Sequence, residues 1–162
     1  MRHLLAIAFA VAVLAGVAPA AASTPSRIQF SAEVSPSSVS TSDPLVVRVT
    51  VANEGTTRAC VFGSLNYLIT LRVFNHAGAE VHGPVHFETT PPPPRKASAF
   101  VCLEPGHSLG TTWREPLAPL GLTSPGTYSL RLEYRHVFSS KFTFGLPVWS
   151  GSAVVTAPFS IR

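Results

Sequence analysis

Nine residues decide the fold: Leu45-Val46-Val47-Arg48-Val49-Thr50-Val51-Ala52-Asn53. Valines alternate with Arg48 and Thr50, so apolar and polar side chains take turns along the segment. Successive side chains of a β-strand point to opposite faces, and this pattern therefore predicts a strand with one buried and one exposed face. The following Asn53-Glu54-Gly55 predicts the turn that ends it.

The same alternation recurs on both sides of this strand, and the chain after residue 22 shows no helical period. Strands are expected at 28–34, 45–53, 67–73, on a hairpin return through Val81, and at 97–103, 109–113, 127–137 and 152–161. Pro158 in the last of them favours an edge position or a bulge, because proline has no N–H to donate. The pattern predicts an all-β, antiparallel sandwich of about 7–8 strands.

Three short motifs carry a resemblance to a known group of modules. They are the strand that ends in Asn53-Glu54-Gly55, the segment Leu103-Glu104-Pro105-Gly106-His107-Ser108, and Pro125-Gly126-Thr127-Tyr128. Together they resemble landmarks of bacterial secreted immunoglobulin-like or fibronectin-III-like modules. The last is similar to a tyrosine corner, whose hydroxyl bonds to backbone upstream. The resemblance implies an immunoglobulin-like sandwich, and a fold of this kind implies no particular function.

Residues 1–22 are predicted to be a secretory signal peptide that is cleaved on export. Arg2 and His3 precede an apolar run of about 14 residues, which is too short to span a bilayer as a helix. Val17 stands where a lipobox would need cysteine, so no lipid anchor is expected by that route. Residues 23–162 would then form a single immunoglobulin-like domain, secreted or periplasmic and with no membrane span.

Composition argues against several classes of protein. Only 12% of the residues are charged, and 10 Phe, 3 Tyr and 2 Trp are typical of a β-rich core rather than of a disordered chain. The formal net charge is +4, but the basic residues are scattered and only Arg95 and Lys96 are adjacent. Nucleic-acid binding usually needs a clustered basic surface, so no nucleic-acid partner is expected.

Cys60 and Cys102 are the only two cysteines. In an oxidising compartment an isolated pair is expected to form one disulfide. A redox-active pair would normally form a Cys-x-x-Cys motif, which the sequence lacks. The two residues are therefore predicted to be a structural cross-link.

Gly106-His107-Ser108-Leu109-Gly110 matches the Gly-x-Ser-x-Gly motif of hydrolases. That chemistry requires the serine on a tight turn between a strand and a helix, with an acid and a histidine that Glu115 or Glu133 and His136 could supply. Residues that favour strands follow Ser108, however, and no βα repeats are present. We therefore interpret the motif as a turn between strands and expect no catalytic residues and no cofactor.

Three histidines, His76, His82 and His86, suggest a metal site. On a regular strand His82 and His86 share a face about 13 Å apart, too far for joint coordination. Gly83-Pro84 could bend the chain and bring them together, so the three remain candidates. Surface histidines on a hairpin, with no bound metal, are the expectation.

A proline run followed by two cations is the most individual segment: Pro91, Pro92, Pro93, Pro94, Arg95 and Lys96. Such a run is extended and preordered, and it would bind a partner with little loss of entropy. It could equally be a simple connection between the two sheets. A second segment, 138–149, carries four aromatic residues that either cap the core or form an exposed platform.

Together these features predict a secreted, non-catalytic module that binds a protein or cell-envelope ligand through its loops. The alternatives are a protease inhibitor that uses one rigid loop and a periplasmic metal-binding protein. The identity of the ligand and the oligomeric state stay open.

Overall fold

The computed structural model describes residues 27–86 and 93–162, and within them it shows ten strands and four short 3₁₀ helices. The strands are β1 Ile28–Val34, β2 Ser38–Val39, β3 Leu45–Asn53, β4 Ala59–Phe62, β5 Ile69–Asn75, β6 Glu80–His86, β7 Phe100–Leu103, β8 Ser108–Glu115, β9 Gly126–His136 and β10 Gly151–Ile161. The 3₁₀ helices are η1 Leu65–Leu68, η2 Ala97–Ala99, η3 Ala118–Leu120 and η4 Ser140–Phe142.

The prediction of an all-β fold is confirmed, but the expected 7–8 strands is wrong, because β2 and β4 were missed. β2 has only two residues, too few for a pattern. All four residues of β4 are buried, so its sequence shows no alternation of apolar and polar residues. Alternation reveals only strands with one exposed face.

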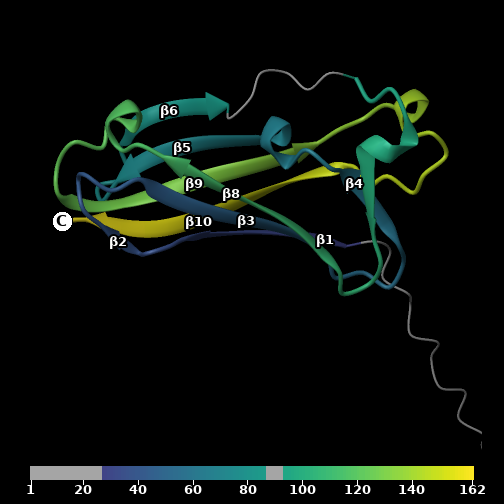
Figure 1. The fold of residues 1–162 in the computed structure, drawn as a ribbon, viewed down its shortest axis with the longest axis horizontal. Coiled ribbons are helices and arrows are strands. Elements are labelled where there is room, and N and C mark those ends of the chain that lie inside the picture. Colours follow the sequence, from purple (N-terminus) through teal and green to yellow (C-terminus); the bar gives the residue numbers. More distant parts are fainter. Residues whose placement is uncertain (1–26, 87–92) are drawn as a thin grey trace, which may run out of the picture.

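The strands form two main layers and a small end sheet (Figure 1). One layer has the order β1-β3-β8, the other has the order β2-β10-β9-β5-β6, and β4 pairs with β7. The pairing is antiparallel as predicted, except between β2 and β10, where Ser38 and Val39 run parallel to Ser160 and Ile161. That pairing covers only the end of β10, so among the described residues no strand pairs with its outer edge beside Pro158. The edge position expected for Pro158 is therefore confirmed.

The core lies between the two layers. β3 contributes Leu45 and alternate valines, all fully buried, and its register sets Val49 between Ala32 of β1 and Thr111 of β8. β9 contributes Leu130, Leu132 and Tyr134 from the opposite layer, also fully buried. Each such aliphatic side chain stabilises the fold by about 1.5–3 kcal/mol relative to an exposed one. The alternation in the sequence thus located the core faces correctly.

Two predicted strands begin later than expected. Tyr67 lies in η1 rather than in β5, and residues 97–99 form η2 before β7 starts at Phe100. The tyrosine corner is confirmed in its main feature, since the hydroxyl of Tyr128 donates to the carbonyl of Ser124 at 3.0 Å.

The predicted disulfide is confirmed. Cys60 on β4 and Cys102 on β7 face each other directly and are joined. β4 and β7 stand at one end of the sandwich (Figure 1). Among residues 27–86 and 93–162, no helix is long and apolar enough to cross a membrane. Residues 1–22 lie outside the described residues, so the signal peptide stays a prediction.

Candidate functional site

The Gly-x-Ser-x-Gly segment forms a turn and a strand. Gly106 adopts φ +80° in a turn that His107 closes by donating its N–H to the carbonyl of Glu104. Ser108 begins β8 and lies opposite Ala52 of β3. A nucleophile elbow needs a helix directly after the serine. The segment has a strand there, so it lacks the geometry of an elbow.

The candidate metal ligands are spread over the β5–β6 hairpin. His76 lies in the turn, and His82 is on β6 opposite Val73. His86 is opposite Thr70, but its side chain lies outside the described part of the structure. Where side chains are described, no three His, Cys, Asp or Glu residues come together as a metal site.

The proline-rich loop is described only from Pro93; Pro91 and Pro92 lie outside the described residues. Pro94 is buried, whereas Arg95 and Lys96 are exposed. The next residues are tied down, because Ala99 accepts a hydrogen bond from the N–H of Gly63 at 2.8 Å. The chain is thus anchored on both sides of two outward-facing cations.

The aromatic segment after β9 divides into anchors and exposed residues. Phe138 packs against Phe62 and Phe100, with ring centres 5.4 and 5.5 Å away. The ring of Trp149 stacks on Tyr134, and the backbone N–H of Trp149 donates to the carbonyl of Cys60 at 3.0 Å. These contacts confirm core capping for Phe138 and Trp149. They also fix residues 137–150 to the disulfide-bonded sheet.

His136, at the end of β9, lies fully buried beneath this segment. Its Nε2 accepts the backbone N–H of Phe62 at 2.8 Å, so the neutral ring carries its proton on Nδ1. Nδ1 of His136 and the hydroxyl of Tyr134 have no hydrogen-bond partner among the described groups. The sequence indicated this burial, because His136 lies an even number of residues from Leu130, Leu132 and Tyr134 and therefore on the same face of β9.

Burial lowers the pKa of His136 from 6.5 to about 4, and backbone groups of Trp149 and His136 itself offset part of that shift. Its ring neighbours Phe100, Phe138, Tyr134 and Trp149 are uncharged at neutral pH. Between pH 6.5 and 4, His136 is therefore protonated in the unfolded chain but stays neutral in the folded chain.

The contribution of His136 to the free energy of unfolding is expected to be fully present above pH 6.5 and to be lost as the pH drops toward 4. Between pH 7.5 and 4.5 the His136 contribution to the free energy of unfolding should fall by roughly 2–3 kcal/mol. Urea denaturation of the wild type and of His136→Gln at both pH values measures it. The glutamine keeps an acceptor for Phe62 but does not titrate, so an equal pH dependence in the two proteins would contradict the assignment.

The exposed part of the segment carries apolar side chains and a cation. Phe144 is 43% exposed and Val137 is 60% exposed, and Nζ of Lys141 lies 4.8 Å from the ring centre of Phe142. Arg95 and Lys96 come directly before η2 and β7, and Phe100 at the start of β7 contacts Phe138 of the segment after β9. We call this set the tip surface: Arg95, Lys96, Val137, Lys141 and Phe144. Neither 93–103 nor 137–150 contains an acidic residue.

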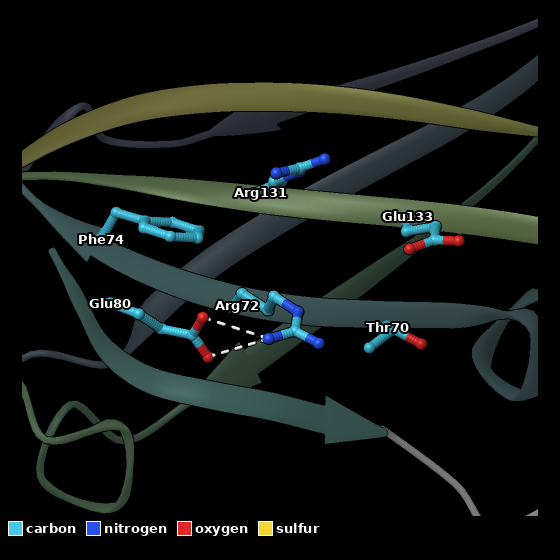
Figure 2. Close-up of a pocket in the computed structure, with 6 residues that line it drawn as sticks. All are labelled: Thr70, Arg72, Phe74, Glu80, Arg131 and Glu133. Atoms are coloured by element: carbon cyan, nitrogen blue, oxygen red, sulfur yellow. Dashed lines mark hydrogen bonds and ion pairs between the residues drawn. The ribbon is translucent and has the colours of Figure 1, made fainter. Parts of the chain in front are cut away.

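A shallow hollow of about 340 Å³ lies on the outer face of the five-stranded sheet. Its lining residues are Thr70, Arg72, Phe74, Glu80, Arg131 and Glu133 (Figure 2). Nη1 of Arg72 donates to both carboxylate oxygens of Glu80 at 3.1 Å. Two arginines and two glutamates cancel in charge, so this hollow has no net attraction for ligands of one sign. The tip surface carries three cations and no acidic residue, so it attracts anionic ligands.

No protein-family model and no curated protein matches the chain. Among solved structures, the β-glucosidase EmGH1 from Erythrobacter marinus is 14% identical over 85% of this chain and 16% of its own, with a TM-score of 0.43. A Listeria innocua β-glucosidase is 13% identical, with the same coverage and TM-score. Spo0M from Bacillus subtilis is 10% identical over 83% of this chain and 49% of its own, at 0.39. These likenesses are too weak to assign a function.

Proposed function

We propose that this chain is an exported, non-catalytic β-sandwich module that binds cell-envelope material through the tip surface. One observation carries the proposal. Three cations and two exposed apolar side chains lie on segments 93–103 and 137–150, which contain no carboxylate and which aromatic contacts and the disulfide-bonded sheet hold in place. Such a surface attracts anionic partners and offers apolar area for contact.

The anchoring favours binding over simple connection. Phe138 and Trp149 pack into the body, and Ala99 is hydrogen-bonded to Gly63, so the cations and apolar tips stand on a framework that is already ordered. A preordered surface loses little conformational entropy when it binds. The proposal keeps the loop-mediated binding expected from the sequence and extends it from Arg95 and Lys96 to the segment after β9.

The test is co-sedimentation of the protein, purified after export, with bacterial envelope particles. The triple variant Arg95→Glu, Lys96→Glu, Lys141→Glu is expected to lose most of the binding, because it reverses every cation of the tip surface. The effect should weaken in high salt, since exposed charges are screened over about 10 Å at 0.1 M.

A matched control changes the charge equally elsewhere. Arg114, Arg131 and Arg162 are exposed and lie outside the tip surface. Their replacement by glutamate should leave sedimentation close to that of the wild type. Equal loss in both triple variants would mean that overall charge decides binding, and the proposal would be wrong.

A further inference from the structure

We infer that the partner of the tip surface is an anionic phospholipid bilayer, with Phe144 entering the boundary between head groups and acyl chains. The inference rests on the proposed function and names its ligand. It concerns contact with the surface of a bilayer and not a membrane span.

Phe144 stands where a bulky residue is disfavoured. Phe144 has φ +55° and Gly145 has φ +74°, and the N–H of Leu146 donates to the carbonyl of Thr143 at 3.0 Å. Two successive positive φ values inside such a closed turn are typical of a type I′ turn, whose central positions favour Asn, Asp and Gly. A phenylalanine with positive φ costs backbone energy, and Phe144 as a whole residue is 43% exposed. The exposed part of the side chain is available for an apolar contact outside the fold.

The chemistry around Phe144 suits a lipid surface. Val137 projects a second apolar side chain from the same segment, and Lys141 lies between the two in sequence. Arg95 and Lys96 add charge from the neighbouring loop, without an acidic residue in either segment. A bilayer interface takes up apolar side chains to a depth of about 5–10 Å while cations pair with anionic head groups.

The first experiment uses lipid vesicles and the exported protein. Vesicles of phosphatidylglycerol and phosphatidylcholine should bind roughly a hundredfold more tightly than vesicles of phosphatidylcholine alone, since each cation near an anionic surface adds about a fivefold factor. Sedimentation of the vesicles measures the bound fraction. Equal affinity for the two compositions, or no binding to either, would overturn the inference.

The second experiment separates lipid contact from folding. Phe144→Asn places a residue that favours positive φ at the turn, so its melting temperature should equal or exceed that of the wild type. Its affinity for the anionic vesicles should nevertheless fall about tenfold, because the buried ring is lost. Val154→Asn is the matched control, since Val154 is 51% exposed on β10, away from the tip surface. Unchanged vesicle binding by Phe144→Asn would overturn the assignment of the ring.

The two proposals fail in different ways. If envelope particles capture the protein through the tip cations but pure lipid vesicles do not, the proposed function stands and the lipid inference is wrong. Loss of capture after the particles are treated with protease would point to an envelope protein as the ligand. If neither particles nor vesicles respond to the tip substitutions, both proposals are wrong.

Discussion

Removal of the Cys60–Cys102 disulfide is expected to lower the free energy of unfolding by about 4 kcal/mol. The two residues are separated by 42 positions, and a cross-link over a loop of that length restricts the unfolded chain by about this amount. Loss of the disulfide should also weaken the folded state itself. β4 and β7 form only a two-stranded sheet, and an isolated pair of strands is marginally stable in water.

Urea denaturation of the wild type and of the Cys60→Ala, Cys102→Ala double variant measures the loss. A domain of this size has a total stability of about 5–15 kcal/mol, so the variant should unfold at much lower urea concentration. Because the backbone of Cys60 also bonds to Pro147 and Trp149, the tip surface should loosen as well. A loss below about 1 kcal/mol would contradict the role assigned to this bridge.

Substitution of Asn53 is expected to be nearly as costly. Its fully buried side chain makes three hydrogen bonds: Nδ2 donates to the carbonyls of Thr57 and Leu103, both at 2.9 Å, and Oδ1 accepts the N–H of Gly55 at 3.0 Å. The backbone of Asn53 also pairs with Gly106 and His107. One side chain therefore joins the end of β3 to the turn before β4 and to the end of β7.

Asn53→Asp keeps the oxygen that accepts the N–H of Gly55. It replaces the N–H donor to the carbonyls of Thr57 and Leu103 by a carboxylate oxygen, which cannot donate. The expected loss is at least about 3 kcal/mol, since each buried polar group left unpaired costs about 1–3 kcal/mol. Asn75→Asp is a matched control, because Oδ1 of Asn75 also accepts backbone N–H groups, from Ala77 and Ala79, but in an exposed turn. The control should change stability by less than about 0.5 kcal/mol. Similar losses in the two variants would show that the Asn53 donors are not needed.

The strands were the most predictable part of the fold. The expected range 45–53 matches β3, the range expected for β9 is shifted by one residue at both ends, and the range expected for β10 differs by one residue at its start. Each of these strands has one buried and one exposed face, so its pattern is local. β4 is buried throughout, because β7 lies on one side of it and residues 147–149 on the other, and no local pattern records those neighbours.

The candidate site was only partly predictable. Arg95 and Lys96 were singled out from their sequence and are exposed in the structure, and the cysteine pair was predicted from composition and compartment. Residues 138–149 were recognised as aromatic, yet their sequence could not separate the anchors Phe138 and Trp149 from the exposed Phe144. All three are aromatic residues in an irregular segment, where no period links position to burial.

Alternation along the chain therefore determined the class of fold and the inward faces of the long strands, and the cysteine count with the expected compartment determined the cross-link between Cys60 and Cys102. The tertiary structure alone decided that Asn53 joins separate segments and that Phe144 and Val137 are exposed while Phe138 and Trp149 are packed. The reason is physical. A strand pattern depends on neighbours two residues away, whereas exposure in a loop depends on contacts with β4, β7 and β9, which are distant in sequence.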